Sequence, residues 1–324
     1  MKILFTGASS FSGFWYVKAL CARGHELFCT FTKPSPNEYD ETCRERIESL
    51  PADAKKTWAC PTGSEAFKTL VESSDRWDSV CLHGASVGNY KSPDFNVFDA
   101  LRANTAGIAE LSSWMSPRGC RAAIATGSYS EADEGCGTTP LKAFAPYGLS
   151  KTLSFEYTRF HFLQTGISTG KFVMPNPFGA YEKPGSFTTY LAKCWAEGKT
   201  PKVRTPDYIR DNIHVSLLAE AYADFVETTA RSGFCSAKIN PGEYRSTQKE
   251  FALMFARQIG DRLGLETPID FAVQSDFSEP MARTNTLDYA PLATRWNESA
   301  AWDFTAAYYA RKYNIPPHQG THRT

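Results

Sequence analysis

Short apolar segments alternate with longer amphipathic stretches through the first half of the chain. The apolar segments predict β-strands at 2–7, 26–31, 57–60, 79–85, 122–127 and 171–176. The stretches between them carry apolar residues at helical spacing and predict helices at 14–23, 65–74 and 95–115, with a further helix that starts near Tyr147. Strands that alternate with helices in this way pair in parallel, because each helix carries the chain back across the sheet. The sequence therefore predicts an α/β fold with a doubly wound, Rossmann-like parallel sheet.

A glycine-containing loop, TGASSFSG (6–13), lies between the first predicted strand and the first predicted helix. In this place Gly7 permits a tight turn, Gly13 permits close packing of helix on strand, and the helix N-terminus attracts a pyrophosphate. The middle glycine of such loops is replaced by Ser10, which still offers its backbone N–H. We therefore expect a bound dinucleotide, and an ordinary strand-to-helix turn is the alternative. The loop residues expected to bind it are Gly7, Ser9, Ser10, Phe11 and Ser12.

The end of the second predicted strand indicates which dinucleotide binds. An acidic residue there would bind a free ribose 2′-hydroxyl, but the chain reads Phe31, Thr32, Lys33, and its next acid is Glu38. Thr32 and Lys33 could instead bind a 2′-phosphate. The sequence therefore favours NADP, while NAD remains possible and a solvated loop lysine is an equal alternative for Lys33.

Composition argues against several other classes of protein. The 324 residues include 35 acidic and 35 basic side chains and are 42% hydrophobic, so a large core is expected without the basic surface typical of nucleic-acid binding. Nine cysteines without a Cys-x-x-Cys pair predict neither a disulfide framework nor a metal site. The chain has no apolar run of about 18 residues and begins directly with a predicted strand. We expect a cytoplasmic protein with no nucleic-acid or membrane partner.

Two tyrosines precede a lysine by four residues, Tyr147 with Lys151 and Tyr308 with Lys312. Such a pair can serve as a catalytic acid with its electrostatic support, because positions i and i+4 share one face of a helix. With 15 tyrosines in the chain, one match is expected by chance. The spacing alone therefore does not decide, and the position of each pair along the chain must.

Several landmarks in a fixed order are more specific than any one motif. After the glycine loop come VCLHGAS (80–86), RANTAG (102–107), IATGS (124–128), YGLSK (147–151), NPFGA (176–180) and IRDNIHV (209–215). This order resembles the extended short-chain dehydrogenase/reductase family, the NAD-dependent epimerases and dehydratases of sugar nucleotides. The resemblance covers nearly the whole chain. It places Tyr147 where the family has its catalytic tyrosine and leaves Tyr308 as a coincidence.

The resemblance implies four catalytic residues. Tyr147 would exchange a proton with a sugar hydroxyl or ketone, since a nearby ammonium lowers the pKa of a phenol from its usual value of about 10. Lys151 would supply that charge and also hydrogen-bond the nicotinamide ribose. Thr126 would hold the reacting oxygen, and Ser128 is the alternative for that role because the segment carries both hydroxyls.

Further binding residues follow from the same resemblance. Contacts to the cofactor are expected from Gly84, Ala85, Asn104 and Pro175, in addition to Thr32, Lys33, Tyr147 and Lys151. The diphosphate of a sugar nucleotide is expected to be bound by Asn176, Arg204, Arg210 and Arg283. For Arg210, the alternative is a surface arginine at the end of a strand.

A Pro- and Gly-rich segment after residue 174 marks a change of organisation. The predicted dinucleotide-binding domain spans 1–174, with 209–240 returning to it. The predicted substrate lobe for the sugar nucleotide comprises 175–208 and 241–324, and it is smaller and interleaved with the end of the sheet.

A homodimer is also expected, because family members commonly pair through two long helices. The corresponding helices here are those predicted at 95–115 and from 147 to 164. Phe155, Tyr157 and Phe162 are the aromatic residues expected to be exposed on the second of them, although core packing would explain some of these.

The residues after Thr126 indicate the reaction. The family's 4,6-dehydratases have an Asp-Glu pair directly after this threonine, because removal of water needs an acid and a base. Here Gly127 and Ser128 follow, and Glu131 and Glu134 lie further on, so dehydration is disfavoured. We expect an NADPH-dependent 4-ketoreductase of a nucleoside-diphosphate 4-keto-6-deoxy sugar. The alternative is a sugar-nucleotide 4-epimerase, and a non-catalytic module that senses NADP is weighted lower.

Overall fold

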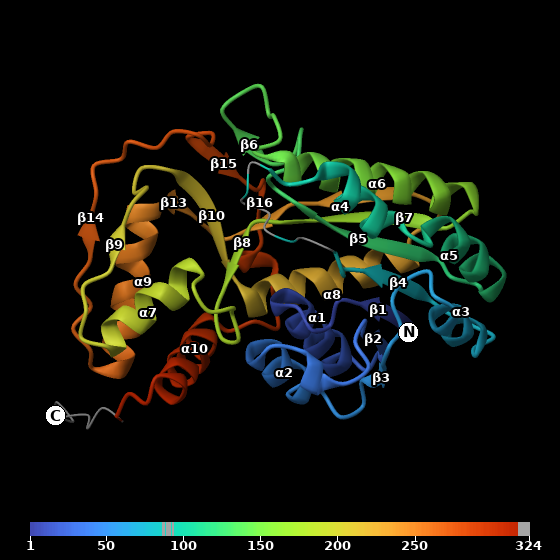
Figure 1. Cartoon of the computed structure of the whole chain (residues 1–324), viewed down its shortest axis with the longest axis horizontal. Helices are drawn as coiled ribbons and strands as arrows, with labels where there is room; N and C mark the ends of the chain where they lie inside the picture. The colour runs from blue at the N-terminus through green and yellow to red at the C-terminus, as the bar shows by residue number, and fades with distance from the viewer. Residues whose placement is uncertain (86–87, 89–91, 93, 317–324) are drawn as a thin grey trace.

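A parallel β-sheet forms the centre of the protein in the computed structural model, which describes residues 1–85, 88, 92 and 94–316 (Figure 1). Within these residues the sheet has seven strands, β1 (Lys2–Thr6), β2 (Glu26–Thr30), β3 (Lys55–Thr57), β4 (Ser79–Leu82), β5 (Ala122–Ser128), β7 (Ser168–Met174) and β11 (Ser236–Ile239). Their order is β3-β2-β1-β4-β5-β7-β11, and every neighbouring pair is parallel. The chain starts in the middle, fills one side and then crosses to the other. This confirms the predicted doubly wound, Rossmann-like fold.

Helices cover both faces of this sheet. On one face α1 (Phe11–Ala22) packs against α8 (Val215–Arg231), and α2 (Glu41–Glu48) lies beside α1. The other face carries α3 (Glu65–Glu72), α4 (Val97–Thr105), α5 (Ile108–Met115) and α6 (Pro146–Gln164). Side chains of β1 alternate between the two cores: Ile3 and Phe5 are buried on the α1 side, and Leu4 is buried on the α5 side. Both faces of the sheet are thus covered, as is usual for parallel sheets.

The second lobe is built on a smaller mixed sheet. Its strands are β6 (Cys136–Gly137), β8 (Asn176–Phe178), β10 (Ile209–His214), β13 (Tyr244–Thr247) and β15 (Ala282–Thr284). β10 pairs in parallel with β8 and β15 and antiparallel with β13, while β6 pairs antiparallel with β15. The helices of this lobe are α7 (Phe187–Ala196), α9 (Gln248–Leu263) and α10 (Glu298–Lys312).

Short elements complete the chain. Two small parallel pairs are formed by β9 (Lys202–Val203) with β14 (Asp270–Phe271) and by β12 (Pro241–Gly242) with β16 (Leu287–Asp288). The 3-10 helices are η1 (Pro36–Glu38), η2 (Ser116–Arg118) and η3 (Ala290–Leu292). None of these elements enters the central sheet.

The chain returns to the central sheet a few residues later than residue 209, where the return was expected. β10 lies wholly in the second sheet, because β8, β13 and β15 supply its backbone partners. The next helix, α8, packs on β7 and α1, and β11 then extends the central sheet beyond β7. The crossing between the lobes therefore lies at the junction of β10 and α8.

Two helices replace the single helix predicted over 95–115. α4 ends at Thr105 and α5 begins at Ile108, and Gly107 between them has a left-handed φ of +71°. A Cβ at Gly107 would lie 2.2 Å from the Cα of Gly63 in a neighbouring loop. The close approach of these two loops therefore requires glycine, and the conformation that it permits interrupts the helix.

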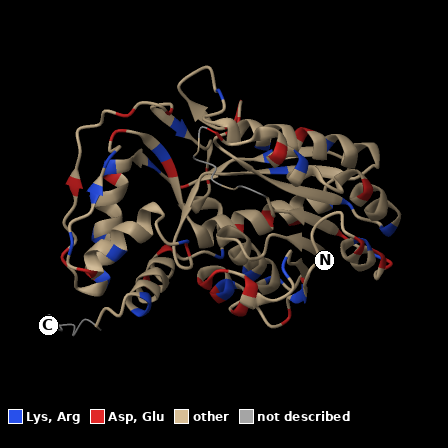
Figure 2. Cartoon of the chain, in the orientation of Figure 1, with Lys and Arg blue, Asp and Glu red and all other residues tan. Residues whose placement is uncertain are grey.

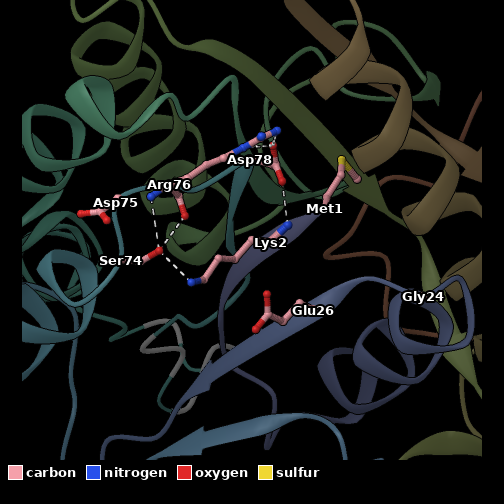
Figure 3. Close-up of a pocket in the computed structure, with 8 residues that line it drawn as sticks. All are labelled: Met1, Lys2, Gly24, Glu26, Ser74, Asp75, Arg76 and Asp78. Atoms are coloured by element: carbon pink, nitrogen blue, oxygen red, sulfur yellow. Dashed lines mark hydrogen bonds and ion pairs between the residues drawn. The ribbon is translucent and has the colours of Figure 1, made fainter.

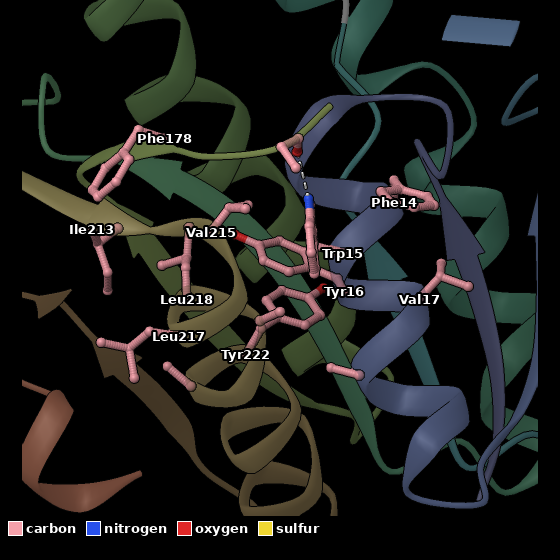
Figure 4. Close-up of a cluster of buried hydrophobic side chains, with 14 of the residues drawn as sticks. Phe14, Trp15, Tyr16, Val17, Phe178, Ile213, Val215, Leu217, Leu218 and Tyr222 are labelled. Carbon is pink, nitrogen blue, oxygen red and sulfur yellow. Dashed lines mark hydrogen bonds between the residues drawn. The ribbon is translucent and has the colours of Figure 1, made fainter. Parts of the chain in front are cut away.

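Aromatic side chains join α1 to α8 and to the second lobe (Figure 4). The rings of Tyr16 and Tyr222 stack with their centroids 4.0 Å apart. The indole N–H of Trp15 donates to the carbonyl of Ala180, 3.1 Å away in the turn that follows β8. The first helix after the glycine loop is thus anchored to both lobes.

Charged side chains of both signs are interspersed over the two lobes (Figure 2). No helix in the described part of the chain is long and apolar enough to cross a membrane. Among the same residues, no three metal-ligating side chains form a cluster.

Candidate active site

The carboxyl ends of four adjacent strands gather the predicted cofactor-binding residues at one edge of the central sheet. β2, β1, β4 and β5 lie side by side, and because they are parallel their carboxyl ends share an edge. The glycine loop follows β1, Thr32 and Lys33 follow β2, Gly84 follows β4, and Ser128 ends β5. Open α/β sheets bind ligands at this edge, where the strand order reverses. The fold therefore brings together residues that are far apart in the first half of the sequence.

The glycine loop is tightly packed. Gly7 has a φ of +83°, and a Cβ on it would lie 2.5 Å from the nitrogen of Gly84. A Cβ on Gly13 would lie 2.2 Å from the carbonyl oxygen of Gly7. Ser10 caps α1, since its Oγ accepts the backbone N–H of Gly13 at 3.1 Å. The loop thus leaves room for glycine alone at two positions and sets the N-terminus of α1 at the ligand-binding edge.

His83 links the glycine loop to β5, a connection that the sequence does not reveal. Its Nε2 lies 2.9 Å from the Oγ of Ser10 and 3.1 Å from the Oγ of Ser12. Its Nδ1 lies 2.8 Å from the Oγ1 of Thr126. Burial and, to a smaller extent, the charge of Lys151 lower the pKa of His83 to about 3, so the ring is neutral near pH 7. A neutral imidazole at the end of β4 therefore joins the glycine loop to β5.

Thr126 and Ser128 lie in different environments although both belong to β5. Thr126 is buried, and its hydroxyl contacts His83. Ser128 is partly exposed at the end of the strand, and its Oγ lies 2.8 Å from the Oγ of Ser130. Of the two hydroxyls predicted for catalysis, that of Ser128 is thus the more accessible to a substrate.

Tyr147 and Lys151 lie in the first two turns of α6, where the spacing of four residues puts them on one face of the helix. The start of this helix packs closely on the loop that follows β5. A Cβ on Gly148 would lie 2.4 Å from the carbonyl oxygen of Ser130, so glycine is needed at that position. This close packing holds the beginning of α6 against the end of β5, which carries Ser128.

Two carboxylates and a lysine are buried beside these residues. The Nζ of Lys171 on β7 lies 2.6 Å from Oε2 of Glu131 and 2.7 Å from Oε1 of Glu134. Burial lowers the pKa of Lys151, the carboxylate of Glu131 raises it, and the charge of Lys171 lowers it. Burial also lowers the pKa of Lys171, but Glu131 and Glu134 together raise it above its ordinary value. Both carboxylates are therefore ion-paired, and neither is the free acid or base that dehydration would need.

The structure differs from the predicted diphosphate site in the position of two arginines. Arg210 on β10 and Arg283 on β15 are neighbours in register, and they are only 2% and 0% exposed. Arg210 pairs with Glu279 at 2.8 Å and also donates to the carbonyls of residues 209, 280 and 281. Arg283 donates to the carbonyls of residues 129, 131, 134 and 142. Their donors serve buried loop carbonyls, which would otherwise lack partners. Arg204 is exposed just beyond β9.

The loop after β2 leaves Thr32 and Lys33 exposed. The ammonium of Lys33 donates to the carbonyl of Glu38 in η1 and lies 5.1 Å from the centroid of the Tyr39 ring. The hydroxyl of Thr32 lies 3.4 Å from that of Tyr39. Both side chains are thus close to η1, at the edge of the sheet where the adenosine end of a dinucleotide would be expected.

The remaining predicted binding residues lie around the same edge. Asn176 begins β8, and its Oδ1 accepts a hydrogen bond from the hydroxyl of Tyr129 at 3.0 Å. Pro175 is buried between β7 and β8, and Asn104 lies in α4. Ala85 is the last described residue before the segment 86–87. Tyr129 was not among the predicted residues, and its position directly after Ser128 is the only signal in the sequence.

A separate surface hollow lies at the amino ends of the central strands (Figure 3). It is lined by Met1, Lys2, Gly24, Glu26, Ser74, Asp75, Arg76 and Asp78. The Nζ of Lys2 donates to Ser74 Oγ at 2.7 Å, and its backbone N–H donates to Asp78 Oδ2 at 2.8 Å. The hollow lies at the amino end of β1, away from the edge at which such sheets bind ligands, so it is separate from the candidate active site.

The sequence model of the NAD dependent epimerase/dehydratase family matches residues 3–233. The chain belongs to this family. The match includes the glycine loop, both hydroxyls on β5, and the pair Tyr147 and Lys151. It confirms the resemblance of the motifs to the extended short-chain dehydrogenase/reductase type, and the protein is an enzyme of that type.

Solved structures of family enzymes share the fold over nearly the whole chain. UDP-glucuronic acid 4-epimerase from Bacillus cereus, in complex with UDP-glucuronic acid and NAD, has a TM-score of 0.74 at 17% identity over 97% of this chain and 100% of that chain. UDP-glucose 4-epimerase from Thermotoga maritima, with UDP-glucose, has a TM-score of 0.72 at 15% identity over 96% and 99%. The UDP-Glc/GlcNAc 4-epimerase of Campylobacter jejuni has a TM-score of 0.69 at 18% identity over 96% and 99%. No curated protein sequence matches this chain.

Proposed function

We propose that this family member interconverts nucleoside-diphosphate sugars that differ in configuration at C4, with NAD as its cofactor. The observation that carries the proposal is the placement of Tyr147 and Lys151 at the start of α6, which packs against the loop after Ser128, beside carboxylates that are already ion-paired. Oxidation and reduction at one carbon need only a single proton-transfer unit together with a dinucleotide, whereas dehydration needs a further acid and base. The family match and the likeness to three 4-epimerases support the choice of reaction.

Each of these residues has a separate role in the proposed reaction. The Lys151 ammonium, on the same face of α6, favours the phenolate form of Tyr147. The phenolate would accept the proton of the sugar 4-hydroxyl during oxidation at C4, and would return it during the reduction that gives the opposite configuration. Ser128 donates a hydrogen bond to the same oxygen, while Thr126 stays with His83. A bound nicotinamide supplies the acceptor and donor of the hydride.

The residues at the carboxyl edge fit a dinucleotide. The contact of Gly7 with Gly84 and the position of the α1 N-terminus leave backbone N–H groups at the place where a pyrophosphate binds in such loops. We assign the cofactor contacts to this loop and to Lys151. Asn176, which Tyr129 positions, is the proposed contact to the substrate, and Arg204 is the exposed arginine of the predicted set.

An NADPH-dependent 4-ketoreductase is the second candidate, and one observation favours it. No acid follows β2 at residues 31–33, and the exposed Thr32 and Lys33 offer a hydroxyl and a positive charge to a 2′-phosphate. A reductase exchanges its cofactor in every turnover, whereas an epimerase regenerates it in place. The two candidates therefore differ in what happens to the dinucleotide.

The test combines cofactor identification with turnover. The protein is purified and denatured, and the released dinucleotide is identified by chromatography; we expect NAD or NADH in a stoichiometric amount. UDP-glucose, UDP-galactose, UDP-N-acetylglucosamine and UDP-glucuronic acid are then supplied singly, and products are separated while the nicotinamide absorbance is recorded. Isomerisation without net absorbance change supports the epimerase. Net oxidation of NADPH with a 4-keto-6-deoxy sugar nucleotide, and no isomerisation of any UDP-sugar, would establish the reductase instead.

A further inference from the structure

The side chain of Glu131 points back to the end of β5, the strand that precedes it. Glu131 lies three residues beyond the end of β5, its side chain is fully buried, and its Oε1 accepts the backbone N–H of Ser128 at 2.7 Å. A hydrogen bond from a backbone N–H to a carboxylate is charge-assisted and stronger than a neutral one. The bond fixes the backbone of the residue whose hydroxyl is proposed to meet the substrate.

Lys171 holds Glu131 in this position from the neighbouring strand. Its Nζ lies 2.6 Å from Oε2 of Glu131, so the carboxylate bridges Lys171 and the backbone of Ser128. A Cβ on Gly127 would lie 2.8 Å from the Cε of Lys171 and 2.9 Å from Oε1 of Glu131. A larger residue at position 127 would therefore collide with this ion pair, which lies against β5.

We propose that Glu131 is a positioning residue of the reaction, which fixes Ser128 and places a negative charge beside the Tyr147 and Lys151 pair. The proposal rests on the proposed function, because it concerns the same proton-transfer unit. Lys171 compensates the charge of Glu131, since an unpaired buried carboxylate would be strongly destabilising. In this arrangement Glu131 acts through its neighbours and does not touch the substrate.

Glu134 provides a matched comparison within the same loop. Like Glu131, it is buried and pairs with Lys171, at a distance of 2.7 Å. Its other partners are Lys238 at 3.1 Å and the side-chain amide of Asn240 at 3.2 Å, both beyond the end of α8. Glu134 makes no hydrogen bond to Ser128 among the contacts of the described residues. Loss of its charge therefore disturbs the ion pair but not the proposed function of Glu131.

The charges near Lys151 determine in which direction its pKa should change when Glu131 is neutralised. Glu131 comes from the loop after β5 and Lys171 from β7, and they act on the pKa of Lys151 in opposite directions, with burial as the largest influence. Buried His83 faces Lys151 from the end of β4 and stays neutral. When Glu131 loses its charge, burial and Lys171 remain and the pKa of Lys151 falls. Because the proposed mechanism needs protonated Lys151, activity should then be lost at a lower pH on the alkaline side.

The experiment compares Glu131→Gln with Glu134→Gln in the full-length enzyme. kcat/KM is measured against pH for the wild type and both variants. We expect the alkaline limb to move to lower pH by about one unit in Glu131→Gln, the size typical of one nearby opposite charge, and to stay in place in Glu134→Gln. A merely structural role would lower the thermal stability of both variants without moving the limb of either.

A second readout needs no turnover. The dissociation constant of NADH is measured against pH by fluorescence, with Lys151→Met as the reference that identifies the Lys151 limb. A shift in Glu131→Gln alone supports the positioning role even when no UDP-sugar is isomerised, in which case the proposed function fails and this proposal stands. Equal shifts in both Gln variants, or a shift in neither, overturn it.

A third variant covers the case in which Glu131→Gln does not fold. Glu131→Gln combined with Lys171→Met removes both members of the pair, and buried Glu134 keeps Lys238 as its partner. Because the two charges act on Lys151 in opposite directions, the alkaline limb of this variant should lie close to that of the wild type. If the limb of the double variant instead moves to higher pH by about one unit, loss of the Glu131 charge does not offset the loss of Lys171 and the proposal is wrong.

Discussion

Tyr308 accepts a hydrogen bond from the ammonium of Lys312 at 2.9 Å and donates one to Oε2 of Glu45 at 3.2 Å. The second Tyr-x-x-x-Lys pair of the sequence thus joins α10 of the second lobe to α2 of the first. Burial and the carboxylate of Glu45 raise the pKa of Tyr308, which is the opposite of what a catalytic phenol needs. The same spacing therefore serves a contact between lobes at one place and the candidate site at the other.

Arg46 strengthens the contact from the next position on α2. Its Nη1 donates to the carbonyl of Tyr181 in the second lobe at 2.9 Å, and its Nε donates to the carbonyl of Ser9 in the glycine loop at 2.8 Å. The side chain is almost fully buried. The conformation of the glycine loop is therefore tied to the position of the second lobe.

Replacement of Tyr308 by Phe should weaken the contact between the lobes without affecting catalysis. The variant Tyr308→Phe loses one hydrogen bond between α10 and α2 and one within α10, and we expect the free energy of unfolding to fall by about 1–2 kcal/mol. Urea unfolding measures this loss, and turnover of a UDP-sugar serves as the control. A loss of turnover as large as that of Tyr147→Phe would show that this pair takes part in the reaction.

Replacement of Tyr147 should instead reduce catalysis and leave the free energy of unfolding nearly unchanged. Tyr147→Phe removes the proposed acid and base but little buried structure, so kcat should fall by about 10²–10⁴-fold while the free energy of unfolding changes by less than about 0.5 kcal/mol. Lys151→Met should reduce kcat as well and also weaken NADH binding. Near-normal turnover in Tyr147→Phe would remove this residue from the mechanism.

The two hydroxyls on β5 should respond differently to removal. Ser128→Ala should lower kcat at least about tenfold, because a hydrogen bond to the reacting oxygen is lost, with little change in stability. Thr126→Val leaves the buried ring of His83 without one partner and should lower the free energy of unfolding by about 1–3 kcal/mol. Steady-state kinetics and urea unfolding of both variants test the assignment, and the reverse pattern would make Thr126 the catalytic hydroxyl.

The buried carboxyl group of Glu182 should make the stability of the folded protein depend on pH. It is buried in the turn between β8 and α7, where the hydroxyl of Thr188 donates to its carboxyl group. Burial raises the pKa of Glu182 to about 7, whereas in the unfolded chain it is about 4.3. The folded protein therefore keeps a proton that the unfolded chain releases, so this contribution to stability is complete below about pH 4 and is lost as the pH rises through about 7.

Glu182→Gln cannot ionise and should gain stability relative to the wild type as the pH rises. Between about pH 5 and 7 the gain should approach 1.4 kcal/mol per pH unit at most. Urea unfolding of both proteins at several pH values measures the difference. If the difference stays constant across this range, Glu182 does not titrate with a raised pKa.

The outer face of α4 and α6 predicts a homodimer. Phe98 is 75% exposed on α4, and Leu149, Leu153, Tyr157 and Phe160 are exposed at helical spacing on α6. Of the aromatic residues expected on this face, Tyr157 is exposed, but Phe162 is 0% exposed in the core and Phe155 lies against the ammonium of Lys171. An apolar stripe of this length on paired helices fits a second copy of the same face.

A charged substitution on this face tests the dimer. Leu153→Glu combined with Tyr157→Glu should convert the dimer to a monomer in sedimentation velocity at micromolar concentration, because the charges would be buried at the interface. Val273→Lys is the control, since Val273 is exposed on the second lobe, away from both helices. A wild-type protein that sediments only as a monomer contradicts the prediction.

The features that the sequence predicts well are those with a local cause. Apolar segments of strand length followed by amphipathic helices indicate a parallel sheet, and the two glycines of the loop after β1 are needed for its tight turn. Tyr147 and Lys151 share a face because one helix carries both of them. The single helix expected over 95–115 was wrong for a reason outside the segment, since Gly107 meets Gly63 there.

Contacts between segments far apart in the sequence could not be predicted from local patterns. Arg283 has the charge and shape to bind a diphosphate, and only the tertiary structure shows that its two Nη groups donate to carbonyls of the loop after β5. His83 and Glu131 likewise acquire their partners through the pairing of β1, β4, β5 and β7. The sequence determined the sheet, the glycine loop and the helix that carries Tyr147 and Lys151, because local periodicity and backbone sterics specify these. Tertiary structure alone decided which buried polar groups are partners, because that depends on which strands become neighbours.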